Sequence, residues 1–526
     1  MTNSIKDIEE ADCILITGSN TSECHPVIAD LVRRAVQRKG AKLIVVDPRR
    51  IDLAGLANIF LQARPGTDVA WINGMMNVIW KEGLWDRRFV EERTENLESL
   101  IPVIEKYTPS LVQEITGISA PVLERAARMY GSASRASILY AMGLTQHTTG
   151  TDNVRSIANL AMLTGNLGKR GSGVNPLRGQ NNVQGACDMG GLPGLYPGYQ
   201  PVSNPEAQSK FQKAWGVKLS PNPGLCMTEA VDKMAQGEIK ALYVMGENPL
   251  MSDPDLNHLK KAFERLDFLM VQDIFLNETA QMAHVVFPAA LFAEKEGTVT
   301  NTERRVQRVR KAVRPPGGCL EDWRIISGLS HAMGFSMNYL SAEEIFREIS
   351  RLTPSYAGMS YARLERKGLQ WPCPSADHPG TPILHVNKFA RGKGLFHPVE
   401  YFPPAERPDE QYPFVLTTGR YYYHYHTGTM TRRSKALNML CPEGFVEIHP
   451  GDAARLSLED GDKVRLKSRR GAIEIRLKKA ERCPQGILFV PFHFREAMVN
   501  LLTNSALDPV AKTPELKVCA VALEKV

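Results

Sequence analysis

The first fifty residues alternate apolar runs with polar turns in the order of a parallel β-α-β unit. Apolar runs predict strands at 13–16 and 43–46, and apolar residues at helical spacing predict a helix at 26–39. A polar turn at 18–21 follows the first strand, and Asp47 ends the second. Two parallel strands need a crossover connection, usually a helix, so the pattern predicts a β-α-β unit.

A second stretch of the chain repeats this pattern. Its members are a strand at 241–245, a turn at 246–249, a helix at 255–266, a strand at 268–272 and Asp273. From the glycine of the turn to the aspartate is 29 residues in the first unit and 27 in the second. The pattern therefore predicts an internal duplication of two similar α/β units.

The segments around these units differ in pattern. Apolar spacing predicts helices within 68–81, 122–130 and 320–352. The run 165–198 is rich in glycine and has no periodicity, and a loop of that length in a compact chain is usually functional. Residues 353–412 are rich in proline and predict an irregular connection.

From Phe414 onward the pattern changes to that of β-strands. Residues 463–467 and 472–477 alternate apolar with polar side chains, and the turn at 468–471 predicts that they form a hairpin. We therefore expect a mixed β-barrel over the last part of the chain.

Composition narrows the function classes. The 526 residues are 43% apolar with a net charge of +7, and the basic residues are spread in short clusters, unlike a nucleic-acid-binding tail. No apolar run reaches the roughly 20 residues of a transmembrane helix. The polar, acidic start shows no signal peptide. The nine cysteines form no CxxC pair, which argues against zinc and iron–sulfur sites and does not imply disulfides.

The two turns are suited to phosphate. Each precedes a helix whose first backbone N–H groups can face an anion, and each unit ends on an aspartate placed to accept from a ribose hydroxyl. Neither turn has the GxGxxG pattern of an NAD site. Two packing units without a ligand are the alternative, but the matched pair favours a cofactor with two nucleotides or two copies of a nucleotide cofactor.

Asp68 and Arg178 are the strongest single candidates. Asp68 opens a predicted helix, where Thr67 as the cap and the helix dipole give it a purely structural interpretation. Its functional interpretation is that the carboxylate accepts from N1–H and N2–H of a guanine. Arg178 lies among glycines and amides, and arginine suits bidentate capture of a carboxylate. A buried structural arginine is the alternative.

Histidines are weaker candidates. His147 and His424 could act as acid–base groups, although a lone histidine is more often structural. Aromatic neighbours and Arg420 suggest a pocket around His424.

A set of motifs spread over nearly the whole chain is specific for one family. The motifs are GSNTSECHP (18–26), VVDPRR (45–50), RPGTD (64–68), MLTGNLG (162–168), GVNPLRGQNNVQGACDMG (173–190), MGENP (245–249), VQDIF (271–275), EGTVTNTERRVQRV (296–309) and LLTNSALDPVAKTPELK (501–517). By these motifs the chain resembles the catalytic subunits of molybdenum- or tungsten-dependent formate dehydrogenases, which bind bis-molybdopterin guanine dinucleotide. The block 173–190 is the most specific of them.

The resemblance implies an α/β fold with two Rossmann-like, doubly wound domains, one for each pterin guanine dinucleotide, and a C-terminal double-psi β-barrel that covers both. The expected boundaries are 1–180 and 181–292 for the two Rossmann-like domains, 293–385 for a helical and irregular connection, and 386–526 for the barrel.

The resemblance also implies the roles of individual residues. Asp47 and Asp68 match the motif around one guanosine; Gly246, Asn248, Gln272 and Asp273 match the motif around the other. Arg178 matches the arginine that orients formate. The barrel would supply Arg420, His424, Asn504 and Lys517, and further cofactor contacts are expected from Gly18, Asn20, Arg49, Gly66, Gln146 and Gln180. No metal ligand is expected from these residues.

The sequence departs from the family in one respect. Family members begin with a four-cysteine [4Fe–4S] domain and then supply a cysteine or selenocysteine, with an adjacent histidine, to the metal. We find no such segment, so we expect an N-terminally incomplete first domain and no activity from this chain alone. A selenocysteine codon read as a stop, a split subunit and a deliberate fragment are the alternatives.

The implied reaction is the oxidation of formate to CO2 in the cytoplasm. The expected partners are the N-terminal segment and electron-transfer subunits that are iron–sulfur proteins or are linked to NAD, ferredoxin or hydrogenase. Another oxidoreductase of the family, such as a nitrate reductase, and a non-catalytic scaffold are the rival hypotheses. The sequence of the loop around Arg178 argues against a nitrate reductase. The presence of Arg178 together with both nucleotide turns argues against a non-catalytic scaffold.

Overall fold

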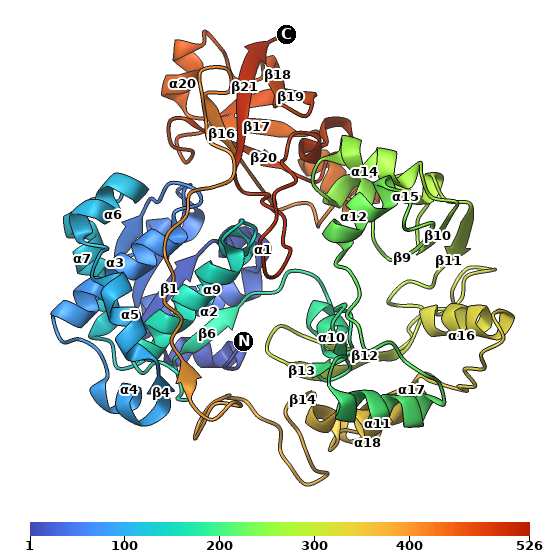
Figure 1. Ribbon diagram of the computed structural model, residues 1–526. Coiled ribbons are helices and arrows are strands. Elements are labelled where there is room, and N and C mark those ends of the chain that lie inside the picture. Colours follow the sequence, from blue (N-terminus) through green and yellow to red (C-terminus); the bar gives the residue numbers. More distant parts are fainter. The chain divides into compact units, whose positions relative to one another are not determined.

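Two interleaved sets of chain segments make up the computed structural model, which describes residues 1–526 (Figure 1). Unit 1 consists of Met1–Leu177, Met251–His258 and Ile383–Val526, and unit 2 of Arg178–Leu250 and Leu259–Pro382. The chain changes unit within two short helices, α13 (Pro249–Ser252) and α14 (Leu256–Phe263). None of the helices has the length and apolar character needed to cross a bilayer. The predicted four-part domain division stays a prediction.

A five-stranded sheet, in which every neighbouring pair is parallel, forms the centre of the N-terminal part of unit 1. Its strand order is β3-β2-β1-β5-β6. The bounds are β1 Cys13–Thr17, β2 Lys42–Val46, β3 Ile59–Leu61, β5 Ala136–Tyr140 and β6 Gly173–Pro176.

Helices cover both faces of this sheet. Cys13 and Leu15 of β1 belong to one buried cluster and Ile14 and Ile16 to another, because successive side chains of a strand point to opposite faces. Helix α2 (Pro26–Lys39) supplies the second cluster, and α3 (Asp68–Lys81), α7 (Ala120–Gly131) and α9 (Gly150–Leu163) supply the first. The other helices of unit 1 are α1 (Thr21–Cys24), α4 (Arg87–Arg93), α5 (Leu97–Ile104), α6 (Pro109–Thr116), α8 (Met142–Thr145), α19 (Lys435–Leu440) and α20 (Pro450–Arg455).

The glycine-rich run 165–198 contains more regular structure than its sequence predicts. Its residues 173–176 form the edge strand β6, and residues 183–188 form the helix α10. Both elements are too short for a hydrophobic period to show.

Unit 2 carries the second β-α-β pattern. Strands β9 (Ala241–Met245), β10 (Phe268–Asp273) and β11 (Val285–Pro288) form a parallel sheet in the order β11-β10-β9. A second, antiparallel sheet contains β12 (Gly297–Thr300), β13 (Arg305–Val309) and β14 (Leu369–Gln370). The helices of this unit are α10 (Val183–Asp188), α11 (Pro205–Trp215), α12 (Met227–Ala235), α15 (Glu278–Gln281), α16 (Asp322–Ala332), α17 (Ala342–Leu352) and α18 (Tyr361–Leu364).

The C-terminal part of unit 1 is a closed six-stranded barrel in the order β16-β20-β17-β19-β18-β21. Its strands are β16 (Phe414–Gly419), β17 (Phe445–Ile448), β18 (Lys463–Lys467), β19 (Ala472–Lys479), β20 (Ile487–Pro491) and β21 (Cys519–Lys525). The predicted hairpin is β18–β19, antiparallel with Lys467 opposite Ala472. The predicted α/β class with a C-terminal barrel is therefore confirmed.

A buried carboxylate joins the barrel to the first sheet. Glu447 of β17 has a fully buried side chain, and Arg49, just after β2, reaches its Oε2 at 3.2 Å. Arg482 donates to the same oxygen through Nε at 2.9 Å and to Oε1 through Nη2. The Arg49 guanidinium also lies over the Phe489 ring, 3.4 Å from its centroid. Two arginines thus share one carboxylate, and one of them comes from the other end of the chain.

We predict that Glu447→Gln lowers the free energy of unfolding of unit 1 by about 3–5 kcal/mol, because it leaves the Arg49 charge buried without a counter-charge. The measurement is urea unfolding of wild type and variant, followed by circular dichroism. Glu474→Gln on the neighbouring strand is the matched control, since Glu474 forms only partly exposed ion pairs with Lys463 and Arg465 and should cost less than about 1 kcal/mol. Equal shifts of the urea midpoint in the two variants would show that the buried ion pairs of Glu447 stabilise the fold no more than the exposed ones of Glu474.

Candidate functional site

The turn after β1 approaches a neighbouring backbone closely. Gly18 has a φ of 57°, and a Cβ placed there would lie 2.3 Å from the backbone nitrogen of Leu144. Gly143 donates its N–H to the Gly18 carbonyl at 2.9 Å. Only glycine fits this conformation and this contact. Two residues further on, both side-chain amide atoms of Asn20 are buried without a hydrogen-bond partner, which points to a ligand or water as the intended partner.

Two buried carboxyls lie near one another, one just after β2 and one at the start of α3. Asp47 follows β2 and accepts from the Arg49 backbone N–H at 2.9 Å. Burial raises the pKa of Asp47 to about 6, against the lowering influence of Arg49. Asp68 is the first residue of α3 and accepts from Trp71 Nε1 at 3.2 Å. Burial, and also the charge of Asp47, raises the pKa of Asp68 to about 7. Such carboxyls are suited to a ligand that donates hydrogen bonds.

Thr67 takes the capping position of α3 without capping it. Its hydroxyl donates to the Arg64 carbonyl at 2.7 Å, and its side chain accepts nothing from the helix N–H groups. Gly66 precedes it with a φ of 76°, and a Cβ there would lie 2.4 Å from Pro404 Cγ. Thr67 therefore does not cap α3, while Asp68 still occupies the first turn of the helix, where the helix dipole favours an acidic side chain.

Three cationic side chains gather at the barrel side of the same unit. Lys517 is buried and donates to the Thr418 carbonyl at 2.8 Å. Burial lowers its pKa to about 8; Cys24 raises it, and the nearby charges of Arg49 and Arg420 lower it further. The Arg420 guanidinium lies 5.0 Å from the centroid of the Tyr425 ring. Converging cations of this kind are suited to a phosphate group.

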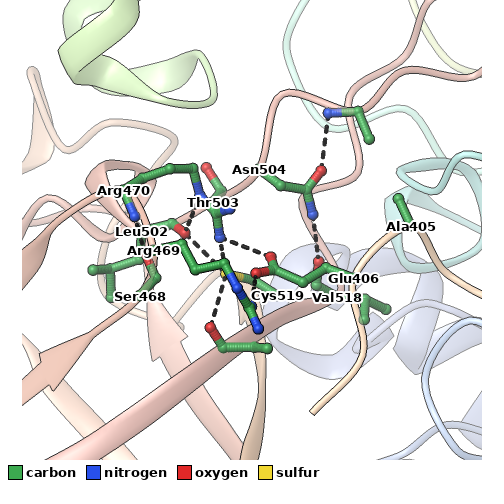
Figure 2. A network of polar contacts seen from close by, with 12 residues as sticks. Ala405, Glu406, Ser468, Arg469, Arg470, Leu502, Thr503, Asn504, Val518 and Cys519 are labelled. Carbon is green, nitrogen blue, oxygen red and sulfur yellow. Dashed lines mark hydrogen bonds and ion pairs between the residues drawn. The ribbon is translucent and has the colours of Figure 1, made fainter. Parts of the chain in front are cut away.

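Other barrel candidates have mainly protein partners. Asn504 donates to the Val518 carbonyl at 3.0 Å and accepts from the Ala506 N–H at 2.9 Å. Figure 2 shows Asn504 and Val518 beside Glu406. Glu406 forms ion pairs with Arg469 and Arg470.

His424 and two residues just after α8 complete the candidates of unit 1. The His424 ring pairs through Nε2 with the Cys441 carbonyl at 2.7 Å and through Nδ1 with the Thr431 hydroxyl at 3.2 Å. Gln146 follows α8 and is half-buried. The adjacent His147 pairs through Nε2 with the Gly143 carbonyl, while its buried Nδ1 has no partner. Burial lowers the pKa of His147 to about 4, so its ring is neutral at physiological pH.

The second turn uses its side chains differently. Gly246 has a φ of 64° and donates its N–H to the Gln272 carbonyl at 2.8 Å. Asn248 accepts from the Thr279 hydroxyl and donates to Glu278, both at 2.8 Å. Gln272 is fully buried and donates to Asp322 at 2.7 Å. The cofactor-facing residues predicted here thus also brace the turn itself.

Asp273 is likewise engaged with its own loop. Its carboxylate accepts from the Ile274 and Phe275 N–H groups and from the Asn277 side chain, at 2.6, 3.1 and 3.0 Å. These contacts fix the direction in which the loop leaves β10.

Arg178 is held by unit 2. Its backbone N–H donates to the Thr302 hydroxyl at 3.1 Å. Its Nε donates to Gln184 Oε1 at 2.9 Å, and Nη1 lies 3.6 Å from Cys187 Sγ. The remaining guanidinium nitrogen, Nη2, makes no hydrogen bond within the chain. Gln180, two residues further on, is half-buried.

The predicted residues divide between the two units. Unit 1 contains Gly18, Asn20, Asp47, Arg49, Gly66, Asp68, Gln146, Arg420, His424, Asn504 and Lys517, and unit 2 contains Arg178, Gln180, Gly246, Asn248, Gln272 and Asp273. Gln184 and Asp188 were not singled out from the sequence, although their spacing of four residues on a short helix places them on one face. No three His, Cys, Asp or Glu side chains lie close enough to hold a metal ion.

The features of unit 1 fit a nucleotide-containing cofactor. The unpaired amide of Asn20 and the carboxyls of Asp47 and Asp68 offer acceptors and donors for a base and a sugar. Lys517 and the arginines near it supply positive charge for phosphates.

Comparison with known proteins agrees with this chemistry. Residues 1–332 match the model of the family described as Molybdopterin oxidoreductase, and residues 414–520 match the Molydopterin dinucleotide binding domain. The F420-dependent formate dehydrogenase subunit alpha of Methanocaldococcus jannaschii is 55% identical over 530 residues, covering 100% of this chain and 78% of the relative. Formate dehydrogenase H of Escherichia coli is 42% identical, covering 100% of this chain and 74% of the relative.

A solved structure supports the fold. Acetylene hydratase from Pelobacter acetylenicus superposes with a TM-score of 0.78 at 21% identity, over 99% of this chain and 81% of that one. The family match and the high identity over the full chain establish more than the fold alone. The chain therefore belongs to the molybdopterin oxidoreductase family of enzymes.

Proposed function

We propose that this chain is part of the catalytic subunit of a formate dehydrogenase and that it takes part in the oxidation of formate to CO2. The observation that carries the proposal is the identity of 55% and 42% to two proteins named formate dehydrogenase, which extends over the full chain. The arrangement of Arg178 supports it, because a guanidinium with an unpaired nitrogen suits a small carboxylate.

The proposed role of Arg178 is to hold and orient the substrate. Its charge-assisted hydrogen bonds bind the formate carboxylate and turn the C–H bond toward the reaction centre. The bonds to Gln184 and Thr302 limit the motion of the arginine before formate arrives. This fixed geometry is the contribution of the protein to the reaction.

We propose bis-molybdopterin guanine dinucleotide with molybdenum or tungsten as the cofactor. When bound, it supplies the two-electron redox chemistry of the reaction. Asn20, Asp47 and Asp68 would hold one guanosine, with Arg49, Arg420 and Lys517 on the phosphates. Gly246, Asn248, Gln272 and Asp273 would face the other. Gly18, Gly66, Gln146, Gln180, His424 and Asn504 complete the proposed contact set.

The proposed enzyme works with other subunits. Relatives named as alpha subunits support this, and we expect iron–sulfur or NAD-, ferredoxin- or hydrogenase-linked partners to take up the electrons. A [4Fe–4S] cluster as the electron exit is part of the proposal. We expect formate turnover from the assembled holoenzyme and not from these 526 residues alone.

Arg178→Ala in the holoenzyme should lower kcat/KM for formate about 10²- to 10⁴-fold, since two hydrogen bonds to a charged group are lost. Arg178→Lys keeps the positive charge but cannot donate two parallel hydrogen bonds. Its kcat/KM for formate should lie between the values of the wild type and of Arg178→Ala. The measurement is dye-coupled formate oxidation, with guanine and metal content determined for each preparation. Near-normal turnover by the Ala variant with full cofactor content would sink the assignment of Arg178. A wild-type holoenzyme that reduces nitrate and leaves formate unchanged would sink the proposed substrate.

Asp68 should make guanine binding depend on pH. The carboxyl must be ionised to accept from guanine N–H groups, and its pKa in the ligand-free chain is about 7. Affinity for GMP, used as the probe, should therefore rise roughly tenfold from pH 6 to pH 8 and be lost as pH falls through 7. Calorimetric titration of the cofactor-free chain at several pH values measures this.

The Asp68→Asn variant should bind GMP weakly and with no such pH dependence. Asp52→Asn is the matched control, because Asp52 is an exposed carboxylate of the same unit paired with Arg33. A pH-independent wild type, or a rise that persists in Asp68→Asn, would contradict the assignment of this carboxyl to the guanine edge.

A further inference from the structure

A chain of buried hydrogen bonds lies behind Arg178. It runs through the first and last turns of α10, from Gln184 to Asp188, and both side chains are nearly inaccessible to solvent. Gln184 accepts from Arg178 Nε at 2.9 Å and donates from Nε2 to Asp188 Oδ1 at 2.8 Å. The substrate-binding arginine is thus connected to a buried carboxylate through one amide.

The orientation of the Gln184 amide is fixed by its two neighbours. A guanidinium can only donate and an ionised carboxylate can only accept, so the amide oxygen must face Arg178 and the amide nitrogen must face Asp188. The flipped amide would place donor against donor on one side and acceptor against acceptor on the other. Gln184 therefore transmits the position of Asp188 to Arg178 in a single geometry.

Asp188 is itself held from three other parts of unit 2. Its Oδ1 also accepts from the Tyr199 hydroxyl at 2.8 Å. Its Oδ2 accepts from the Tyr356 hydroxyl at 2.6 Å and from Trp371 Nε1 at 2.7 Å. Burial and the nearby Asp188 charge raise the pKa of Tyr356, which keeps that hydroxyl a donor. Four donors meet one carboxylate, so its place is determined on all sides.

The tether also decides which edge of the guanidinium meets the substrate. A guanidinium offers two pairs of N–H groups to a carboxylate, one that includes Nε and one formed by Nη1 and Nη2. Gln184 occupies Nε. Nη2 has no partner in the chain, and Nη1 has only the long contact of 3.6 Å to Cys187 Sγ. The end formed by Nη1 and Nη2 is the edge that remains for a ligand.

We propose that Gln184 and Asp188 are positioning residues for substrate binding: the Gln184 amide, oriented by Asp188, blocks the Nε edge of Arg178 and presents its Nη1–Nη2 edge to the carboxylate of formate. This inference rests on the proposed function, because it assigns Arg178 to the substrate. It goes beyond that function by naming the residues that select the binding edge.

Gln184→Leu removes the hydrogen bonds of the amide to Arg178, Asp188 and Tyr199 with little change in volume. In the cofactor-loaded holoenzyme it should weaken formate binding about 10- to 100-fold, the effect of one lost hydrogen bond to a charged group. The loss should appear as a higher KM with a smaller change in kcat, and as a higher dissociation constant by calorimetry. Guanine and metal content should stay at wild-type values. Gln208→Leu is the matched control, since Gln208 donates only to the Leu219 carbonyl, and should leave KM unchanged.

A double-mutant cycle separates positioning from a general structural role. In an Arg178→Lys background there is no Nε fork for Gln184 to hold, so adding Gln184→Leu should change the formate dissociation constant less than about twofold. A structural role unrelated to Arg178 predicts the same loss in both backgrounds and would overturn the proposal. Calorimetry reports the cycle even where turnover is too slow to measure.

Tyr199→Phe keeps the test decisive if Gln184→Leu does not fold. It removes the hydroxyl that donates to Asp188 and accepts from Gln184 at 3.0 Å, and it should raise the formate dissociation constant two- to tenfold. A wild-type value in this variant contradicts the proposal. Wild-type holoenzyme that neither binds nor oxidises formate contradicts the proposed function, whereas formate binding by wild type that is unchanged in Gln184→Leu contradicts the positioning role only.

Discussion

The arrangement of unit 1 depends on the ion pairs that the fully buried carboxylate of Glu447 forms with Arg49 and Arg482. Two arginines converge on this carboxylate, and one of them, Arg49, lies two residues beyond Asp47, which follows β2. A buried charge is tolerated only when it is paired and hydrogen-bonded, so the barrel has to sit where Glu447 meets Arg49. The buried ion pair therefore fixes where Asp47, two residues before Arg49, lies relative to Lys517.

The two β-α-β turns are duplicates in sequence pattern and differ in their hydrogen bonding. In unit 1 the turn leaves Asn20 with unpaired amide atoms. In unit 2 the corresponding Asn248 is braced by Thr279 and Glu278. The same strand-turn-helix pattern therefore yields one turn whose amide is open to a ligand and one whose amide supports its own loop. A duplicated scaffold does not require two chemically equal sites.

Local patterns predicted the elements best where the apolar run or the helical period is unbroken. Helices 26–39 and 68–81 have the predicted bounds, because a clear helical period marks them. The strand 241–245 also has the predicted bounds, although only Val244 of it is buried, because its apolar run is unbroken. Strand β6 was not predicted, since four residues that include Asn175 and Pro176 show no period. Sequence motifs identified the candidate residues, but they did not identify the side chains to which those residues form hydrogen bonds and ion pairs. Glu447 lies 398 residues from Arg49, and no local pattern connects such a pair.

Unit 1 is assembled from segments that leave the ribosome at very different times. Unit 2 is interposed within it, and Glu447 follows Arg49 by 398 residues. At a synthesis rate of about 5–20 residues per second, Arg49 waits roughly 20–80 s for its counter-charge. During that interval the first sheet has a cation at its edge that cannot yet be buried. The N-terminal part of the chain therefore completes its native packing only late in synthesis, and the nascent protein carries an exposed, unfinished surface for most of that time.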